Sequence, residues 1–380
     1  MTQVTHILYL SEKPGQNPFS GAENHIVALV CGLAAKGVDV ELVVLVWNDG
    51  RIIQDRLAAI RKAGVTVTEI FRPGEGFLRT RLVRAGITWN RLRRHLKTIR
   101  NRIVHIHLDL VVVPVLVRLL GIRRAVLSVH NDEPVYRSRR WQLWLRFIDR
   151  WISHYIGITD HVVNYYRTMS GVAHDKIRRI YYGVRRPACV EQDFSEYGVP
   201  GDTVKVGFVG RLTEQKNLFT LLDAFKGLDR VSLVLIGEGP LREPLKAHAR
   251  HHGIDNVYFT GAIPDAASLM CNFDVFCMPS LWEGLGLVFI EAMLSKVPVI
   301  GSKAGAIPEV LGQGRYGILV DTGSPAELRG VLSRVEGDLE KLRERAASAF
   351  HYAEERFSEQ RMIGETIEVY RLVEAQARGR

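Results

Sequence analysis

Short runs of almost entirely apolar residues recur along the whole chain, and most are followed by a helix-length segment. They fall at 4–10, 38–46, 65–71, 103–107, 125–129 and 155–158 in the first half, and at 204–209, 231–236, 257–259, 275–278, 297–300 and 317–320 in the second. Strands that are apolar on both faces belong to parallel sheets covered by helices on both sides. The pattern predicts an α/β protein made of two doubly wound, Rossmann-like domains that face a cleft.

The domain boundaries follow from length and from breaks in this pattern. The 380 residues exceed what one hydrophobic core usually holds. Residues 186–203 contain two prolines and two glycines without apolar periodicity, and we expect them to form a linker. The predicted domains are therefore an N-terminal domain at 1–185, a C-terminal domain at 204–355 and a final helix at 356–380, which could pack back on the N-terminal domain.

Membrane-spanning and secreted classes of protein are not expected. The longest uninterrupted apolar run, residues 110–117, includes a proline and is far shorter than the ~20 residues of a spanning helix. The N-terminus lacks the basic and long apolar regions of a secretory signal, so we expect a cytoplasmic location. The four cysteines, at 31, 189, 271 and 277, form no CxxC and no zinc-like cluster, and we expect reduced thiols with no disulfide and no structural zinc.

The charge is distributed unevenly between the two halves. Residues 1–190 hold 30 lysines and arginines against 14 acidic residues, a net charge of +16, whereas residues 191–380 hold 21 against 27, a net charge of −6. A basic half indicates an anionic partner, which could be a phosphorylated or lipid-linked molecule, an anionic membrane surface or nucleic acid. The arginines from Arg79 to Arg102 are accompanied by few aromatic residues and no nucleic-acid motif, so no nucleic-acid partner is expected.

Two further features of the basic half are interpreted as structural. Trp141, Trp144 and Trp151 recur at helical spacing with arginines on another face, a pattern that could lie in a membrane interface. A helix that packs on its own sheet is the more common explanation, and it is the one we favour. His105 and His107 lie within a strand run and are also read as structural.

Doubly wound folds bind ligands at the strand ends, where glycine-rich motifs can hold a nucleotide. Residues 312–317 match G-x-G-x-x-G, but they follow a helical stretch and precede a strand, so they are interpreted as a turn rather than a dinucleotide site. The sequence Gly-Glu-Gly-Pro at 237–240 does follow a strand, yet it lacks the third glycine. The chain contains no Walker motif, so neither NAD binding nor a P-loop is predicted.

The loop at 210–217 follows a strand and carries two cations five residues apart. Arg211 and Lys216 could converge on a diphosphate near a helix N-terminus, where Gly210 lets a ligand approach the backbone. Two solvated surface cations are the alternative explanation.

The loop at 279–286 leads into an apolar segment that contains a single acid, Glu291. Burial of an unpartnered carboxylate is costly, so Glu291 requires a partner, either ligand hydroxyls or a neighbouring lysine or backbone amide. Glu283, eight residues earlier, is close enough for the two acids to bind a sugar and a ribose on either side of a diphosphate. Gly284 and Gly286 are expected to leave backbone N–H groups open at the helix start, where an anion is favoured.

These motifs together resemble the retaining GT-B glycosyltransferases of family 4, most strongly over residues 206–320. The resemblance rests on Gly210-Arg211-Leu212 with Lys216-Asn217, on Gly237-Glu238-Gly239-Pro240, on Phe259-Thr260-Gly261, on Glu283-Gly284-Leu285-Gly286 with Glu291 in an E-x7-E arrangement, and on Pro298-Val299-Ile300-Gly301, Gly305-Ala306-Ile307-Pro308-Glu309 and Gly317-Ile318-Leu319-Val320.

The resemblance implies a role for each matching residue. Arg211 and Lys216 would hold the donor diphosphate, and Glu291 the ribose hydroxyls. Glu283 would be a catalytic residue that contacts the hydroxyls of the transferred sugar. The other implied donor-binding positions are Gly21, Gly237, Gly284, Leu285 and Gly286, with Ile263 along the base.

In the N-terminal half, residues 20–23 look like the family's glycine-rich loop, and residues 129–132 look like its active-site segment with His130 as the catalytic histidine. An imidazole after a strand can hydrogen-bond a sugar or phosphate oxygen, although a loop-end histidine is more often a polar surface group. Ser20 stands where a second glycine is usual, and Tyr182-Gly183-Val184 replaces a common Asn-Gly-Val.

The resemblance also implies the chemistry. No DxD sequence occurs, so we expect no metal and no cofactor, with charge on the leaving nucleotide stabilised by Arg211, Lys216 and helix-terminal amides. In the family, the acceptor attacks on the face from which the nucleotide departs, assisted by the departing phosphate oxygen.

The expected function is transfer of a sugar from a UDP- or GDP-linked donor to a glycan or lipid-linked acceptor. The expected pathway is cell-envelope polysaccharide biosynthesis (lipopolysaccharide, O-antigen, capsule or exopolysaccharide), at the inner face of the membrane. Two alternatives stay open, namely a sugar-nucleotide epimerase of the same fold and a non-catalytic nucleotide-sugar-binding module.

Overall fold

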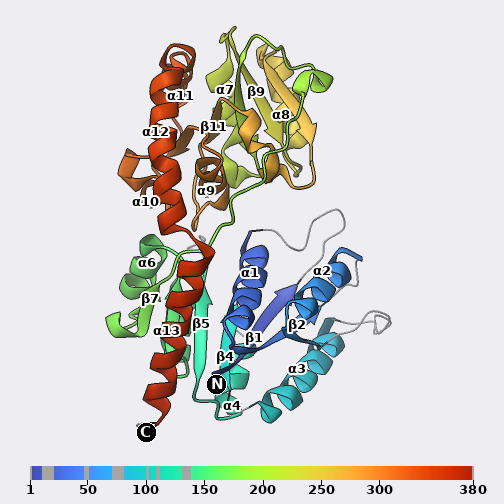
Figure 1. The fold of residues 1–380 in the computed structure, drawn as a ribbon, viewed down its shortest axis with the longest axis vertical. Coiled ribbons are helices and arrows are strands. Elements are labelled where there is room, and N and C mark those ends of the chain that lie inside the picture. The colour runs from blue at the N-terminus through green and yellow to red at the C-terminus, as the bar shows by residue number, and fades with distance from the viewer. Residues whose placement is uncertain are drawn as a thin grey trace. The chain divides into compact units, whose positions relative to one another are not determined.

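A computed structural model describes residues 2–10, 21–46, 51–70, 81–99, 102–107, 112–130 and 138–378 of the chain. The chain divides into two compact units (Figure 1). The first unit comprises Met1–Gly183 together with Glu359–Arg380, and the second comprises Val184–Ser358. The expected linker at 186–203 thus lies within the second unit, and most of the expected final helix lies within the first.

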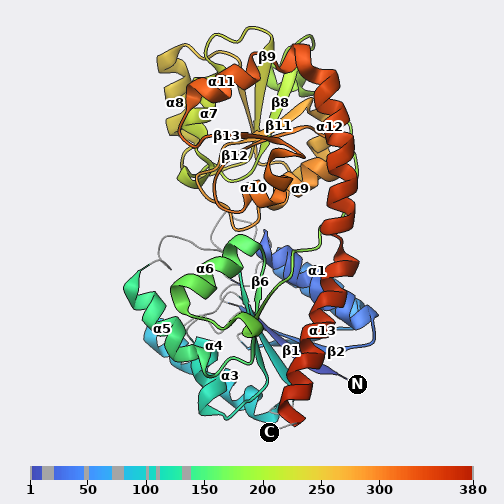
Figure 2. The ribbon, with the colours of Figure 1, turned by 90° about the vertical axis from the view of Figure 1, so that its left-hand side faces the viewer.

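The first unit is built on a seven-stranded parallel sheet of order β3-β2-β1-β4-β5-β6-β7. Its strands are β1 (Gln3–Leu10), β2 (Asp39–Val46), β3 (Thr66–Glu69), β4 (Ile103–His107), β5 (Ala125–Val129), β6 (His154–Gly157) and β7 (Ile177–Arg179). Its helices are α1 (Ala22–Ala35), α2 (Arg51–Lys62), α3 (Arg81–Thr98), α4 (Val112–Leu119), α5 (Arg139–Asp149), α6 (Asp160–Ser170) and α13 (Glu359–Arg378). Figure 2 shows helices on both sides of this sheet, as the apolar strands require.

The C-terminal helix α13 supplies part of the core of the first unit. Met362, Tyr370 and Val373 of α13 are buried in one cluster with side chains of α1 and β1. A Cβ atom added to Gly32 of α1 would lie 2.2 Å from a side-chain carbon of Ile363, so the two helices pack in close contact. Residues more than 300 positions apart in sequence therefore build this core.

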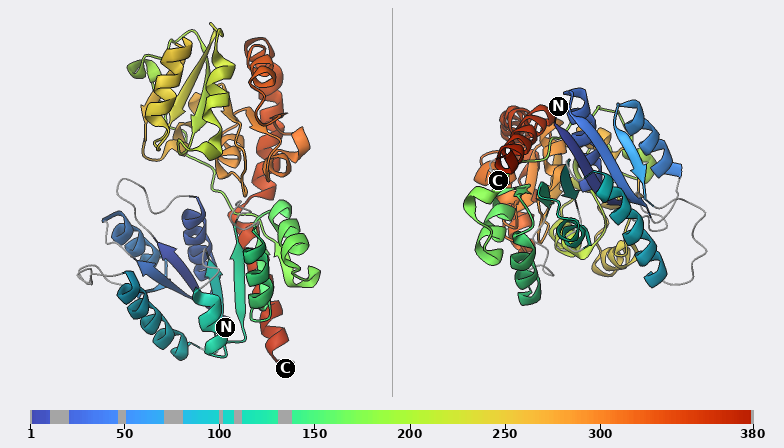
Figure 3. Two further views of the ribbon diagram at one scale, coloured as in Figure 1. Left: turned by 180° about the vertical axis from the view of Figure 1, so that it is seen from behind. Right: turned by 90° about the horizontal axis from the view of Figure 1, so that it is seen from below.

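The second unit is built on a six-stranded parallel sheet of order β10-β9-β8-β11-β12-β13. Figure 3 shows this unit from behind, with helices beside its strands. Its strands are β8 (Val204–Val209), β9 (Val231–Ile236), β10 (Val257–Gly261), β11 (Val275–Met278), β12 (Val299–Ser302) and β13 (Ile318–Val320). Its helices are α7 (Leu218–Phe225), α8 (Arg242–His252), α9 (Leu287–Leu294), α10 (Ile307–Val310), α11 (Pro325–Leu332) and α12 (Val335–Arg356), with 3₁₀ turns that include η4 (Glu214–Lys216) and η5 (Ala266–Asn272).

The predicted fold class, two doubly wound α/β domains, is confirmed by these two parallel sheets. Each of the twelve apolar runs overlaps a strand, because a fully buried parallel strand must be apolar throughout. One strand was missed. β7 at the sheet edge reads Ile-Arg-Arg, and its two arginines are only half-buried, so it carries no apolar run. Among the described residues, no helix combines the length and the hydrophobicity needed to cross a membrane.

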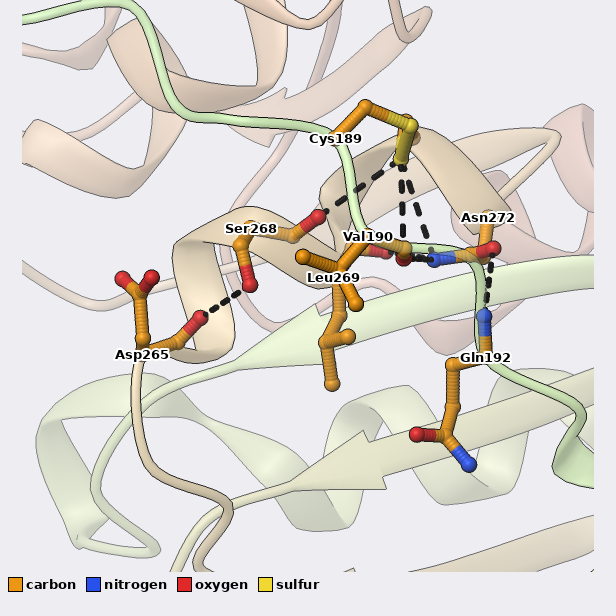
Figure 4. Close-up of a disulfide and its surroundings, with 8 residues drawn as sticks. Cys189, Val190, Gln192, Asp265, Ser268, Leu269 and Asn272 are labelled. Atoms are coloured by element: carbon orange, nitrogen blue, oxygen red, sulfur yellow. Dashed lines mark hydrogen bonds between the residues drawn. A yellow bond between two sulfur atoms is a disulfide. The ribbon is translucent and has the colours of Figure 1, made fainter.

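The expectation of four free cysteines is wrong for one pair. Cys189 and Cys271 form a disulfide with Cα atoms 5.8 Å apart (Figure 4). The segment before β8 lies against η5, where the Val190 N–H donates to the Ser268 carbonyl (3.0 Å) and the Asn272 side chain donates to the Val190 carbonyl (2.8 Å). These contacts bring together two cysteines 82 residues apart, a proximity that spacing in the sequence does not reveal. Cys31 and Cys277 are free.

Candidate functional site

The loops after β8, β9 and β10 are joined through their backbones at the carboxyl edge of the second sheet. The Gly210 N–H donates to the Ile236 carbonyl (3.0 Å), and the Gly237 N–H donates to the Gly261 carbonyl (2.8 Å). A Cβ atom on Gly237 would lie 1.9 Å from the Gly210 oxygen, and the φ of Gly237 is +150°. Only glycine permits this approach, so the loop that carries Arg211 has a fixed position.

The loop at 214–217 is fixed in turn to the loop after β11. The Leu281 N–H donates to the Gln215 carbonyl (2.8 Å), and the Gln215 side chain donates to the Trp282 carbonyl (2.9 Å). This contact brings Lys216 to Glu283, and the two form an ion pair in which their side chains are only 13% and 8% exposed. Two residues that were predicted to bind the same ligand therefore meet, although they are 67 positions apart.

Glu283 is held from two further directions. The Ser280 hydroxyl donates to the same carboxylate oxygen at 3.0 Å, and the Ala306 N–H donates to the Glu283 carbonyl at 3.0 Å. Gly305 has φ +54°, and a Cβ atom there would lie 2.5 Å from the Glu283 carbonyl oxygen. The Ser280 side chain and Gly305 have no role among the expected site residues. The position of Ser280 three residues before Glu283 is the only sequence signal for its contact with Glu283.

Glu291 lies on α9, whose other residues are all apolar. Burial raises the pKa of its carboxyl to about 7, and nearby Asp265 adds to the increase. No residue in the described part of the chain forms a hydrogen bond or ion pair with this side chain, so neither the lysine nor the backbone amide that the sequence left open is its partner. The carboxyl can therefore accept hydrogen bonds from a ligand.

The remaining expected residues of the second unit lie on the same edge of the sheet. Arg211 is exposed, directly follows Gly210, and has no acidic partner among the described residues. Ile263 is half-buried after β10, and Leu285 is buried. Gly286 has φ +73° and precedes the first residue of α9, so the loop reaches the helix through a conformation that favours glycine. Positive groups and a helix N-terminus together favour an anion here.

His130 and Gly21 belong to the first unit. The Nδ1 atom of His130 is hydrogen-bonded to the hydroxyl of Tyr182, and its Nε2 atom is buried without a partner among the described residues. Burial lowers the pKa of His130 to about 3, so its ring is neutral at pH 7. Gly21, with φ +53°, precedes the first residue of α1. Ser20, Asn131 and Asp132 lie outside the described residues.

A second group of histidines, His6, His105 and His107, is buried in the same sheet and could in principle hold a metal ion, since one nitrogen from each lies within 4.8 Å of the others. His6 Nδ1 lies 2.9 Å from His107 Nε2, and His105 contacts the hydroxyls of Tyr370 and Ser128, each at 2.7 Å. His6 Nε2 lies 3.2 Å from the Tyr370 hydroxyl. Five of the six ring nitrogens thus have protein partners, and the group is a hydrogen-bonded network.

The geometry can be compared with known proteins. Residues 190–350 match the family model described as Glycosyl transferases group 1, and residues 19–186 match the model described as Glycosyltransferase Family 4. The chain belongs to the group 1, family 4 glycosyltransferases. Its two Rossmann-like units are those of the GT-B glycosyltransferase fold.

Individual curated relatives match only part of the chain. It is 31% identical over 205 residues to the 2-deoxystreptamine N-acetyl-D-glucosaminyltransferase of Streptomyces fradiae, a match that covers 52% of this chain and 48% of the relative. It is 30% identical over 163 residues to the lipopolysaccharide core biosynthesis glycosyltransferase LpsE of Rhizobium meliloti, covering 43% and 48%. The chain thus spans about half the length of the curated relatives it matches.

A solved structure matches the chain over nearly its full length. HepE of Anabaena, crystallised with UDP and glucose, superimposes with a TM-score of 0.77 over 97% of this chain and 99% of that chain, at 20% identity. At this level of identity the likeness concerns the fold.

Proposed function

We propose that this glycosyltransferase transfers a sugar from a UDP- or GDP-linked donor to a glycan or lipid-linked acceptor, with retention of configuration. The observation that carries the proposal is the Lys216–Glu283 pair at the carboxyl edge of the second sheet, nearly buried and close to a helix N-terminus. A donor sugar with its diphosphate offers a partner to each charge, because the phosphate oxygens suit the ammonium group and the sugar hydroxyls suit the carboxylate. HepE, which shares the fold, was crystallised with UDP and glucose.

In this mechanism Arg211 and Lys216 neutralise the diphosphate as the bond to the sugar breaks, and the N-terminus of α9 adds to the positive potential. Glu283 orients the sugar hydroxyls, and Glu291 accepts hydrogen bonds from the ribose. The backbone of Gly237, Gly284 and Gly286 borders the donor, and Ile263 lies along the base.

The acceptor attacks from the face on which the diphosphate departs, and a departing phosphate oxygen takes the acceptor proton. His130, neutral because its pKa is about 3, acts as a hydrogen-bonding group and not as a proton reservoir. We propose metal-independent transfer, because two cations and helix-terminal amides supply the positive charge that the leaving group requires.

We further propose a place in cell-envelope polysaccharide biosynthesis, with the protein in the cytoplasm and peripherally attached to an anionic membrane. The basic first half, net +16 over residues 1–190, supports an anionic acceptor or surface. Relatives with lipopolysaccharide core biosynthesis and phosphatidyl-myo-inositol mannosyltransferase in their names support the same class of pathway.

The test is a panel of UDP- and GDP-sugars incubated with the full chain, with and without a bacterial lipid extract. We expect free nucleotide to be released and sugar to be incorporated into the extract for one donor, with no added metal. A sugar-nucleotide epimerase would convert the donor without releasing nucleotide, and a binding module would leave it unchanged.

A variant pair separates the site from general effects. Glu283→Gln should reduce transfer at least a hundredfold while nucleotide still binds, because the sugar contact is lost and the phosphate contacts remain. Glu340→Gln, an exposed acid on α12, is the matched control and should transfer at the wild-type rate. Equal rates for both variants would contradict the role given to Glu283.

A further inference from the structure

The helix α5 of the first unit has two different apolar faces. Leu145 and Ile148 are fully buried and pack it onto its own unit. Leu143 and Phe147, four residues apart on another side, are 62% and 46% exposed. Figure 2 shows α5 on the outside of the first unit. Packing on the sheet, the explanation favoured from the sequence, therefore accounts for only one of the two faces.

The exposed face of α5 continues into a row of aromatic rings. The ring of Phe147 lies 5.8 Å from that of Trp144 and 4.7 Å from that of Trp151, and the Arg150 guanidinium lies over it at 5.4 Å. Aromatic rings beside arginines are typical of helices that lie in the headgroup region of a bilayer.

Trp151 and Arg150 also line a hollow of about 740 Å³, together with Arg118, Arg123 and Lys176. Lys176 is paired with Asp149, whereas the three arginines have no acidic partner among the described residues. The hollow therefore combines strong positive charge with an aromatic wall, and it is large enough for a phosphate-bearing headgroup.

The position of α5 in the fold brings its outer face to the edge of the sheet that carries His130, while the hollow lies at the opposite edge, before β5, β6 and β7. The helix begins nine residues after His130, at the carboxyl ends of the strands, and ends just before β6, at their amino ends. Its 11 residues extend about 16 Å. A bilayer lying along the outer face of α5 would thus adjoin the edge that carries His130.

We propose that the outer face of α5 and this hollow, formed by Leu143, Phe147, Trp151, Arg118, Arg123 and Arg150 and called here the α5 surface, bind an anionic lipid bilayer. The apolar side chains enter the headgroup region, and the arginines bind lipid phosphates. The inference rests on the membrane attachment proposed above and names the residues that make it.

The experiment measures cosedimentation of the full chain with vesicles of phosphatidylcholine containing 30% phosphatidylglycerol, and with phosphatidylcholine alone. We expect the wild type to bind the anionic vesicles and to be weakened at least tenfold by 0.5 M NaCl. Leu143→Ser/Phe147→Ser and Arg123→Glu/Arg150→Glu should each weaken binding at least tenfold. Arg93→Glu/Arg94→Glu, two exposed arginines of α3, is the control for net charge and should lose less than threefold.

The outcomes distinguish the surface from the broader proposal. If the wild type does not bind vesicles, membrane attachment itself is wrong. If the wild type binds but the α3 control loses as much as the α5 variants, attachment is diffuse and the α5 surface is wrong. UDP affinity and circular dichroism, expected to be unchanged, show that the variants are folded. If the apolar variant instead turns a dimer into a monomer while vesicle binding persists, the face is an interface between copies and the proposal is overturned.

Discussion

Replacement of Glu291 by glutamine should stabilise the protein, and it should do so more at pH 8 than at pH 5. The carboxyl has a pKa of about 7 in the folded chain against an ordinary 4.5. An acid whose pKa is raised on folding keeps its proton in the folded state while the unfolded state has lost it. The free energy of unfolding therefore falls as the pH rises from about 4.5 to 7, and the loss is complete above 7.

The size of the effect follows from the two pKa values. Ionisation of Glu291 would destabilise the fold by about 3 kcal/mol at pH 8 and by less than about 1 kcal/mol at pH 5. Because Glu291 is partly exposed, these figures are upper limits. Glu291→Gln removes this cost, so the difference between variant and wild type should grow by up to ~2.5 kcal/mol from pH 5 to pH 8.

Urea unfolding at the two pH values, monitored by hydrogen exchange of peptides from the second unit, measures this difference in the free energy of unfolding. All other titrating groups are common to both proteins and cancel. Glu340→Gln, on the exposed side of α12, should change stability equally at both pH values. A Glu291→Gln effect that is the same at pH 5 and pH 8 would refute the reasoning.

The same carboxyl links stability to ligand binding. Ribose hydroxyls that donate to Glu291 favour its ionised form, so binding of UDP at pH 7 should release about half a proton from the wild type and none from the variant. Calorimetry in two buffers of different ionisation enthalpy measures this number. Release of the same number from both proteins would contradict the ribose contact.

Three other predictions concern residues that hold the loops and side chains of the two units in place. Gly237→Ala should destabilise the second unit by more than about 2 kcal/mol in thermal melts, because its Cβ atom would lie 1.9 Å from a backbone oxygen. The control Gly227→Ala, also at positive φ but with open space around it, should cost about 1 kcal/mol, and equal losses would argue against the contact. Replacing Cys189 and Cys271 by serine should lower the urea midpoint of the second unit by the equivalent of roughly 4 kcal/mol, since the disulfide closes a loop of 82 residues, and an unchanged midpoint would contradict this. Tyr182→Phe removes the hydrogen bond to the histidine after β5, so transfer should slow at least tenfold with unchanged nucleotide affinity; an unaltered rate would exclude a positioning role.

Most of the second unit could be predicted from the sequence because its informative residues sit at strand ends. The carboxyl ends of parallel strands share one edge, so motifs after β8, β9, β10 and β11 had to converge. What could not be predicted is which side chains pair. The contact between Lys216 and Glu283 depends on two loop conformations 67 residues apart, and the disulfide on a segment that was read as a linker.

The first unit was predicted less completely, because the loops at 20–23 and 129–132, which carry its expected site residues, contain few sequence motifs. The strand order depends on long-range packing that periodicity does not encode. Even so, part of the histidine network was visible in the pattern. His105 and His107 are two residues apart in one strand and must share a face, and His6 pairs with His105 in register on the neighbouring strand.

The first unit contains buried histidines and the second contains the partly buried Glu291. The pKa shifts of these groups do not show which of them binds a ligand. Burial displaces the pKa of His105 and His107 downward and that of Glu291 upward, in each case toward the neutral form. The histidines and Glu291 differ in the number of their hydrogen-bond partners within the protein. Of the six nitrogens of His6, His105 and His107, five are hydrogen-bonded within the fold, so the protein itself accounts for these side chains. Glu291 is only partly buried and has no such partner among the described residues, so its carboxyl is open to hydrogen bonds from a ligand.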